Sequence, residues 1–156
     1  MIEITIPGYR ALHLEHLVLD YNGTLAVDGH LLDGVKEALS ALSAKVNVHV
    51  LTADTFGRAG AELEDVPCRL FILPRENQDT GKLAYIQRLG CERTVAMGNG
   101  RNDALMLKEA ALGVAVLLAE GAAAATLASA DVVCRDILEA LALLSQPLRL
   151  VATLRS

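Results

Sequence analysis

The stretch Gly98-Asn99-Gly100-Arg101-Asn102-Asp103 separates an apolar run from a helical pattern. The run before it, Thr94–Met97, has the composition of a buried strand, and the residues after it, Ala104–Ala110, have the apolar spacing of a helix. In an open parallel sheet, ligands collect beyond the carboxyl ends of the strands. The stretch therefore predicts an α/β fold and marks one edge of its sheet as a candidate site.

A second polar loop, Asp20-Tyr21-Asn22-Gly23-Thr24, follows another apolar run, Leu17-Val18-Leu19. Because the carboxyl ends of parallel strands meet at one edge of the sheet, we expect the two loops to lie on the same rim. Two polar loops on one rim favour an active site there.

Strand and helix patterns alternate along the chain, which predicts one doubly wound, Rossmann-like domain over residues 1–156, with a central parallel sheet. Ile2–Ile6 alternates apolar and polar residues and predicts a small N-terminal strand or hairpin; Asp28-Gly29 predicts a tight hairpin turn in a flap over the first loop. The expected strands are His16–Asp20, Val46–Leu51, Arg69–Leu73, Thr94–Met97, Leu112–Leu117 and Asp131–Val133. The expected helices are about 34–45, from after Thr55 to Leu63, Gly81–Leu89, 104–110, Gly121–Ser129 and about 135–145, the last ended by Pro147.

The composition predicts a core of Ala, Val, Leu and Ile, because 53% of the residues are hydrophobic and only 3% are aromatic. Such a core is typical of helices packed on parallel strands. A mean hydropathy of +0.37 is high for a soluble monomer. Two explanations remain open, a homo-oligomer that buries apolar surface between subunits and a small Ala-rich domain.

Charge and cysteine content argue against several classes of protein. The net charge is −5 and no Lys/Arg cluster follows any expected element, so we expect no nucleic-acid partner. Cys68, Cys91 and Cys134 form no CxxC pair, which argues against a disulfide framework or a zinc site. The first residues do not resemble a signal peptide, and the most apolar window, 110–130, is broken by a Glu and two Gly residues. We expect a soluble, cytoplasmic protein with no membrane partner.

Asp20 is the candidate nucleophile. A carboxylate at the end of a buried strand, followed by a tight Gly23-Thr24 turn, can attack phosphorus and form an aspartyl phosphate. Phosphoryl transfer also needs positive charge and hydrogen-bond donors around the phosphate, which Lys82 and Thr52 offer at other strand ends. For Mg²⁺, the chain offers Asp20, the backbone carbonyl of Asn22 and an oxygen of the 98–103 loop.

Each of these residues also has an ordinary structural explanation. Asp20 and the Gly98–Gly100 segment are common turn formers, Lys82 is typical of a solvated helix start, and Thr52 is a common helix cap. The ordered set in this strand context favours the chemical interpretation.

Four segments resemble, in order and at fitting separations, the motifs of the haloacid dehalogenase (HAD) superfamily. They are Asp20-Tyr21-Asn22-Gly23-Thr24, Leu51-Thr52-Ala53-Asp54, Lys82 and Gly98–Asp103. The resemblance covers nearly the whole chain after about residue 14. Within the superfamily, the chain is most similar to the phosphorylation domain of P-type ATPases, but it lacks their membrane segments and nucleotide-binding insertion. The resemblance implies a capless HAD domain with Mg²⁺ as cofactor.

The resemblance also assigns residues to three roles. It implies catalytic roles for Asp20, Asn22, Thr52 and Lys82, phosphate contacts at Gly23, Thr24, Thr52, Ala53 and Lys82, and metal binding by Asp20, Asn22, Asn99 and Asp103.

Two positions depart from the family pattern. Asn22 stands where phosphatases of the superfamily usually carry the Asp that acts as general acid and base, and a missing acid/base group lowers the rate by about 10² to 10⁴. Asn99 stands where a metal-binding Asp is usual; its carbonyl still suits Mg²⁺ but carries no charge, which weakens binding unless Asp54 or Asp103 compensates.

Three functions are therefore considered. The first is a slow Mg²⁺-dependent phosphohydrolase that forms phospho-Asp20 and acts on a small phosphorylated substrate or a phosphorylated macromolecule. The second is a HAD member with little or no turnover that binds phosphate or metal as a regulatory subunit. A receiver-type signalling domain is less favoured, because residues 1–19 lack the paired acidic residues of that class. In a homo-oligomer, the flap at Leu25–Leu32 is a possible contact.

Overall fold

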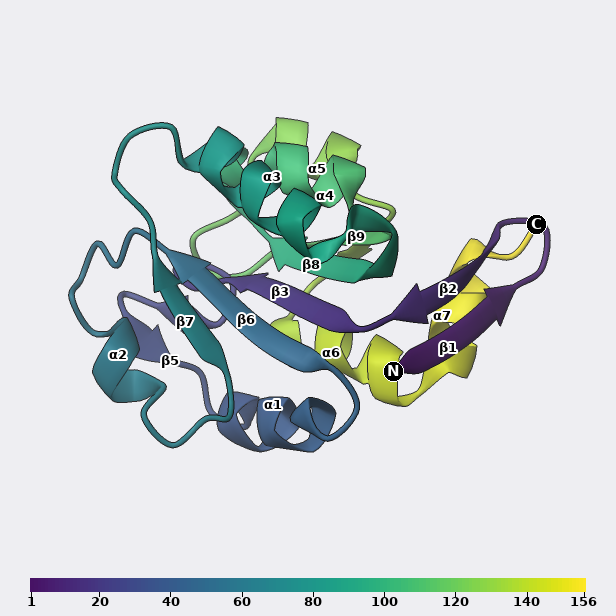
Figure 1. The fold of residues 1–156 in the computed structure, drawn as a ribbon, viewed down its shortest axis with the longest axis horizontal. Helices are drawn as coiled ribbons and strands as arrows, with labels where there is room; N and C mark the ends of the chain where they lie inside the picture. The colour runs from purple at the N-terminus through teal and green to yellow at the C-terminus, as the bar shows by residue number, and fades with distance from the viewer.

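The computed structural model describes residues 1–156 and is built around a six-stranded parallel sheet (Figure 1). In spatial order the strands are β10 (Val132–Cys134), β9 (Leu112–Val116), β8 (Thr94–Gly98), β3 (His16–Asp20), β6 (Asn47–Thr52) and β7 (Arg69–Ile72). The first strand of the sheet, β3, thus lies in the middle, with the later strands added first on one side and then on the other. This is the doubly wound order, and it confirms the predicted fold class.

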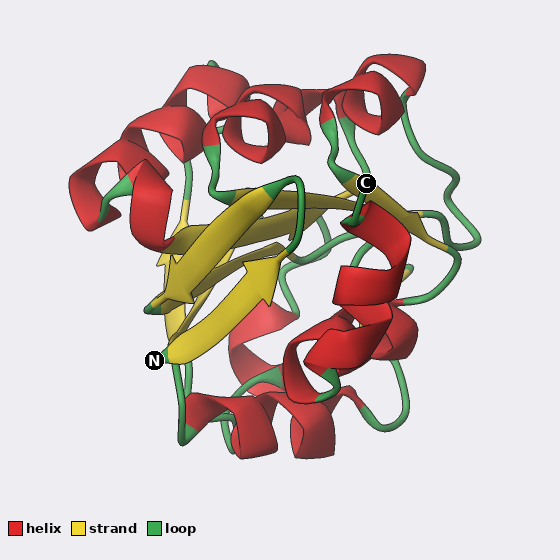
Figure 2. Ribbon diagram, turned by 90° about the vertical axis from the view of Figure 1, so that its right-hand side faces the viewer, coloured by secondary structure: helices red, strands yellow, loops and turns green.

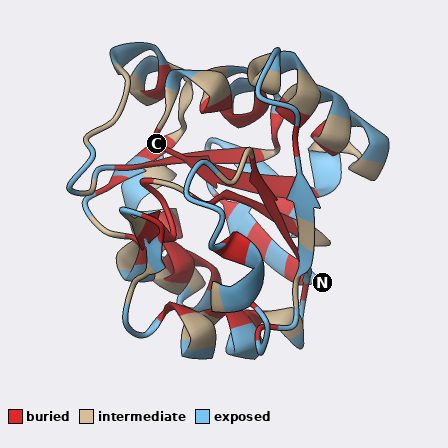
Figure 3. Ribbon diagram, turned by 90° about the vertical axis from the view of Figure 1, so that its left-hand side faces the viewer, coloured by how far each residue is buried: buried red, intermediate tan, exposed pale blue.

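Helices cover both faces of the sheet (Figures 1 and 2). One face packs against α3 (Gln78–Leu89), α4 (Ala104–Glu109) and α5 (Ala124–Ser129), and the other against α1 (Val35–Ser43) and α6 (Ile137–Ser145). The central strands β3, β8 and β9 are almost entirely buried, as Figure 3 shows. Strands that are covered on both faces read as continuous apolar runs, which is why their sequences do not alternate.

The N-terminal residues form a separate antiparallel hairpin, β1 (Ile2–Ile6) with β2 (Arg10–Leu14). Alternate side chains of β1 are buried, and α7 (Pro147–Leu154) packs against this strand. The hairpin joins the amino end of β3, so it lies at the end of the sheet opposite the polar loops (Figure 1). Of the two predicted possibilities, strand or hairpin, the structure shows a hairpin.

The flap is a short two-stranded hairpin, β4 (Ala26–Val27) with β5 (His30–Leu31). Its turn residues Asp28 and Gly29 have φ values of 52° and 82°, the left-handed conformation that a two-residue hairpin turn requires. The Tyr21 hydroxyl donates a hydrogen bond of 2.9 Å to the Gly29 carbonyl beneath it. The predicted flap is thereby confirmed.

Three helices begin at other residues than predicted, and one helix was not predicted. The helix α6 ends at Ser145 as predicted, but Pro147 then opens the unpredicted helix α7, since proline lacks only an N–H that would be unpaired in a first turn. The helix α3 begins at Gln78, three residues before the predicted start, because Gly81 donates to the Asn77 carbonyl inside its first turn. Two helices begin about three residues later than predicted, α2 (Ala59–Glu62) and α5, which starts at Ala124 and not at Gly121.

No single helix is long and apolar enough to cross a membrane. Taken as a pair, α6 and α7 are long and apolar enough by length and composition only, but the chain bends by 100° between them.

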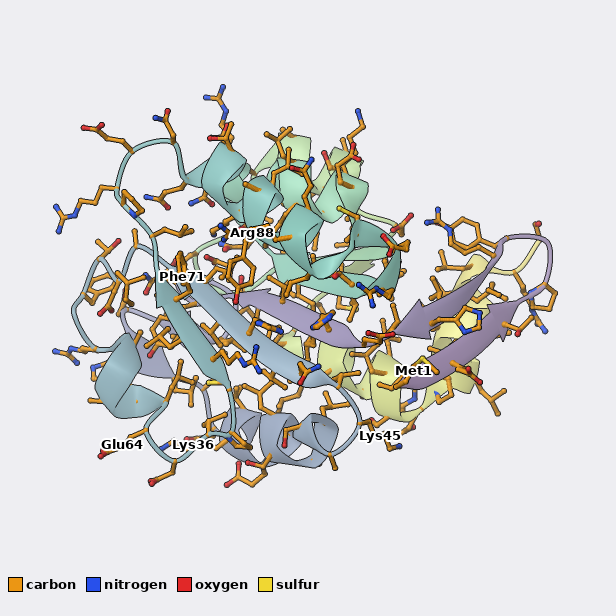
Figure 4. The ribbon with its side chains drawn as sticks, viewed as in Figure 1. Met1, Lys36, Lys45, Glu64, Phe71 and Arg88 are labelled. Atoms are coloured by element: carbon orange, nitrogen blue, oxygen red, sulfur yellow. The ribbon has the colours of Figure 1, made fainter.

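The side chains of His16, His49 and Tyr85 form a hydrogen-bonded row on the α3 side of the sheet. The His49 ring is buried between two polar partners. Its Nε2 atom lies 3.2 Å from His16 Nδ1, and its Nδ1 atom lies 2.9 Å from the Tyr85 hydroxyl oxygen. Phe71 of β7 and Arg88 of α3 flank the Tyr85 ring (Figure 4). Burial, then the nearby His16, lowers the pKa of His49 to about 4, so the ring is neutral at pH 7.

Candidate active site

The site lies where the order of the strands reverses. Asp20 is the last residue of β3, Thr52 is the last residue of β6, and Asn99 follows β8 on the other side of β3. In doubly wound sheets the crevice between the two strands that flank this reversal, here β3 and β8, is the usual ligand position. Three of the predicted motifs therefore meet at one rim, because the sheet order places their strands side by side. The fourth, Lys82, does not lie at a strand end as predicted but reaches this rim from the helix α3.

Lys82 is held between two carboxylates. Its Nζ atom lies 2.7 Å from Asp20 Oδ1 and 2.6 Å from Asp103 Oδ1, and all three side chains are buried. Burial alone would lower the pKa of Lys82, but the two carboxylates raise it above the ordinary lysine value. Burial, and next the charge of Asp20, raises the pKa of Asp103 to about 6, although Lys82 opposes the shift. A charged ammonium group is thus fixed beside the candidate nucleophile.

Asp103 positions the loop that follows β8. Its Oδ2 atom accepts hydrogen bonds from the backbone N–H groups of Asn99, at 3.0 Å, and Gly100, at 2.9 Å. A Cβ atom on Gly98 would lie 2.4 Å from Asp103 Cγ, so only glycine fits at the end of β8. Both carboxylate oxygens of Asp103 thus accept hydrogen bonds, Oδ1 from Lys82 and Oδ2 from the two backbone N–H groups. This geometry suits a positioning role, and metal binding by Asp103 stays a prediction.

Thr24 and Gly23 connect the first loop with the loop after β8. The buried Thr24 hydroxyl lies 3.2 Å from Asp20 Oδ2 and 3.3 Å from Asn99 Oδ1. Gly23 has a φ of 77°, and a Cβ there would lie 2.3 Å from Asn99 Nδ2. Its N–H donates to the Ala26 carbonyl at 2.7 Å, so the Gly23 amide serves the turn, and a phosphate contact at Gly23 stays a prediction.

The loop after β6 presents a hydroxyl to the rim. The buried Thr52 Oγ1 accepts a hydrogen bond of 2.9 Å from the Asp54 N–H, which leaves the hydroxyl proton of Thr52 for a ligand. The Asp54 carboxylate points the other way, since its Oδ1 accepts from the N–H groups of Arg58 and Ala59 at 3.0 Å each. Asp54 therefore caps α2 and does not replace the charge missing at Asn99.

The donor set at the rim fits a hard divalent cation such as Mg²⁺. Asn22 Oδ1 is buried and accepts no hydrogen bond, and an unpaired buried acceptor is destabilising unless a ligand satisfies it. Asp20 Oδ2 and Asn99 Oδ1 make only the long contacts to Thr24. No group of three or more His, Cys, Asp and Glu side chains is arranged to hold a metal, so carbonyl oxygens and water would complete the coordination.

Sequence reasoning missed two features of the rim. Glu120, in the loop after β9, lies over the first loop; its Oε2 would be 2.7 Å from a Cβ on Gly23, and its Oε1 accepts from the Asp28 N–H at 3.4 Å. Asn102 donates a hydrogen bond of 2.7 Å to Gln78 on α3. Glu120 belongs to no motif in the chain, and the 98–103 motif, which contains Asn102, does not indicate that its partner is Gln78.

Three solved structures with similar folds bear the name of the same sugar-acid phosphatase. The cobalt-bound deoxy-D-mannose-octulosonate 8-phosphate phosphatase of Haemophilus influenzae superposes with a TM-score of 0.70 at 16% identity, over 86% of this chain and 88% of that one. A 3-deoxy-D-manno-octulosonate 8-phosphate phosphatase from Moraxella catarrhalis was solved in complex with magnesium, phosphate and KDO. It superposes with a TM-score of 0.69 at 14% identity, over 92% of this chain and 88% of that one. A putative phosphatase of the same name from Vibrio cholerae superposes with a TM-score of 0.71 at 14% identity, over 94% of this chain and 96% of that one.

These likenesses define the fold of the chain. The chain has the capless fold of the HAD superfamily, which confirms the resemblance read from its motifs at the level of the fold. No family model matches the sequence.

By sequence, the chain belongs to the same family as the uncharacterized protein MJ0073 of Methanocaldococcus jannaschii. The two are 42% identical over 83 residues, which are 51% of this chain and 89% of that protein. The uncharacterized protein MJ0072 of the same organism is 46% identical over 39 residues, 25% of this chain and 89% of that protein.

Proposed function

We propose that the protein is a Mg²⁺-dependent phosphohydrolase that works through an aspartyl phosphate on Asp20. The observation that carries the proposal is the buried contact of 2.7 Å between Asp20 and Lys82 at the switch point of the sheet. A buried carboxylate next to a fixed cation is suited to receive a phosphoryl group, because transfer depends on positioning and on neutralising oxygen charge. The phosphatases among the structural neighbours support the same reaction class.

In the first step, a carboxylate oxygen of Asp20 forms a bond to phosphorus, and the bond from phosphorus to the ester oxygen breaks. Lys82 and the Thr52 hydroxyl hold the phosphate oxygens, with the Ala53 N–H as a further donor on the same loop. When bound by oxygens of Asp20, Asn22 and Asn99, Mg²⁺ supplies positive charge to the phosphate. The leaving oxygen departs with the electron pair of the broken bond and takes a proton from water.

In the second step, water forms a bond to the phosphorus of the acyl phosphate and gives up a proton to the solvent. The bond from phosphorus to the Asp20 oxygen breaks, which releases inorganic phosphate and regenerates the Asp20 carboxylate. Asn22 stands where an acid/base carboxylate would protonate the leaving group and activate this water. An amide exchanges no proton in that role, so both steps are slower by a factor of about 10² to 10⁴. We therefore expect low turnover and a long-lived phosphoenzyme, as implied by the resemblance to P-type ATPases.

The test is phosphate release from para-nitrophenyl phosphate by the native protein and by Asp20→Asn. The expected result is Mg²⁺-dependent release that chelator and the substitution both abolish, and a phosphorylated Asp20 peptide found by mass spectrometry after an acid quench. Asp65→Asn is the matched control, because Asp65 is exposed and remote from the rim. Release that is equal in the native protein and Asp20→Asn would refute the proposal.

A second candidate is a phosphate-binding regulatory subunit with no turnover. The observation that favours it is Asn22, whose side-chain oxygen is buried without a partner and whose amide cannot transfer protons. The two candidates separate in the same experiment. A protein that binds inorganic phosphate in a Lys82-dependent manner but releases none from any ester is the subunit, not the enzyme.

The proposed substrate is a small phosphorylated molecule or a phosphorylated segment of a macromolecule. We further propose that the protein acts in the cytoplasm as a homo-oligomer. The exposed apolar side chains of Phe71 and Ile72 on the edge strand β7, and of Phe56 next to the flap, support the oligomer.

A further inference from the structure

A cavity of about 520 Å³ is lined by residues that lie close in the chain to Lys82 and Asp103 of the candidate site. Its walls come from the loop before α3, the first turn of α3, the turn Arg101–Asp103, and the starts of α4 and α5. Gln78, which lines it, lies one helical turn before Lys82, a separation of about 6 Å along one face of α3. Asn102, which also lines it, directly precedes Asp103 in the chain. The cavity is therefore within reach of a small molecule whose phosphate group lies at Asp20.

Two arginines give this cavity a positive charge. Arg75 and Arg101 line it from different segments, and both are exposed and form no ion pair within 4.0 Å. The single acidic lining residue is Asp79, whose Oδ1 accepts from the Thr80 N–H at the start of α3. In a chain with a net charge of −5, two unpaired guanidinium groups at one cavity mark a site for an anion.

We propose that this cavity is a second anion subsite, so that the substrate is a phosphate monoester that carries a further anionic group, a carboxylate or a second phosphate, about one to two helical turns (roughly 6–11 Å) from the first. The inference deepens the proposed phosphohydrolase function and rests on it. Guanidinium groups recognise carboxylate and phosphate with paired hydrogen bonds, whereas a neutral hydroxymethyl group makes no charge-assisted contact with them. A hydrogen bond of 2.7 Å from Asn102 to Gln78 ties the turn after β8 to the first turn of α3, so two walls of the cavity are held together.

The experiment compares esters that differ only in the second group. One pair is 6-phosphogluconate and sorbitol 6-phosphate, in which a carboxylate replaces a hydroxymethyl group. The other is fructose 1,6-bisphosphate and fructose 6-phosphate, in which the second group is a phosphate. The native protein is expected to prefer the doubly anionic member of at least one pair by about tenfold in kcat/KM, the lower end for a charge-assisted contact at an open site. The pair that shows the preference identifies the second group.

Variants test the source of the preference. Arg75→Gln and Arg101→Gln are each expected to lower the ratio of the two kcat/KM values, and the double variant to bring it to about one. Asp79→Asn is expected to raise the ratio, because it removes the opposing charge. Arg149→Gln, which makes the same change at an exposed position on α7, is the matched control. The ratio is insensitive to a general loss of active protein.

The outcomes separate this inference from the proposed function. If para-nitrophenyl phosphate is hydrolysed but both pairs give ratios near one, the subsite is refuted and the phosphohydrolase stands. If no ester is hydrolysed, the dissociation constants of 6-phosphogluconate and sorbitol 6-phosphate are measured by calorimetry on Asp20→Asn. A preference that Arg101→Gln removes supports the subsite without turnover, and equal constants, or no binding, refute it.

Discussion

Replacing Lys82 with methionine tests whether this residue neutralises two buried carboxylates. The substitution keeps the length of the side chain and removes its charge, so Asp20 and Asp103 lose contacts of 2.7 and 2.6 Å and face each other without a cation. Each lost charge-assisted hydrogen bond is worth about 1.5–3 kcal/mol. Breaking a buried ion pair by removing one partner costs about 3–5 kcal/mol.

Protonation limits only the part of this loss that comes from charge repulsion, to which the lost hydrogen bonds add. The folded variant escapes the repulsion if one carboxylate takes up a proton, which at pH 7 costs about 4 kcal/mol relative to an unfolded Asp with a pKa of about 3.9. At pH 5 the same step costs about 1.5 kcal/mol. Because the folded-state pKa is raised, the variant gains stability relative to the native protein as the pH falls. We expect Lys82→Met to lower the free energy of unfolding by about 3–5 kcal/mol at pH 7 and by about 1–3 kcal/mol at pH 5.

The measurement is urea unfolding followed by circular dichroism at both pH values. Lys108→Met, at an exposed position of α4, is the matched control and should change the unfolding free energy by less than about 0.5 kcal/mol. Combining Lys82→Met with Asp103→Asn should destabilise less than the two single changes added together, because one buried charge is then gone. A loss below about 1 kcal/mol at pH 7, or equal losses at the two pH values, would refute the role of Lys82 as the shared counter-ion.

Three further changes have defined outcomes. Asn22→Asp should raise the turnover of para-nitrophenyl phosphate by about 10–100-fold, because it restores an acid/base group; unchanged turnover would place the defect in metal binding or substrate access. Gly23→Ala should lower turnover and Mg²⁺ affinity, since the new Cβ would meet Asn99 Nδ2 at 2.3 Å; native values for both would show that the loop tolerates a side chain. The unfolding free energy should fall by up to about 1.4 kcal/mol per pH unit between pH 6.5 and 4, because the unfolded chain binds a proton on His49 that the folded chain excludes. His49→Gln should remove this component of the slope in urea unfolding at pH 7, 6 and 5, and an unchanged slope would assign it to other groups.

Much of the fold was readable from local patterns. The apolar runs that end at Asp20 and at Gly98 are buried on both faces, and that composition distinguishes a central strand of a parallel sheet from an alternating edge strand. The Asp28-Gly29 pair requires left-handed backbone at two consecutive residues, so the flap hairpin was also predictable. Pro147 correctly marked the end of α6 but did not reveal α7, because proline is compatible with both the end of one helix and the first turn of the next.

The members of the candidate site were readable from motif order, and their contacts were not. Nothing near Lys82 in the chain indicates that it donates to two carboxylates, because these come from the ends of β3 and β8. The position of Glu120 over the first loop and the meeting of Arg75 with Arg101 at one cavity join segments far apart in sequence.

Backbone preference and hydrophobic periodicity act over a few residues, so the chain by itself established its strands, most of its helices and the identity of its polar loops. Which loop lies beside which depends on the order of the strands in the sheet, and that order is decided by packing both faces of β3, β8 and β9 beneath helices. The tertiary structure alone therefore decided that Lys82 lies between Asp20 and Asp103, and that Arg75 and Arg101 line one cavity.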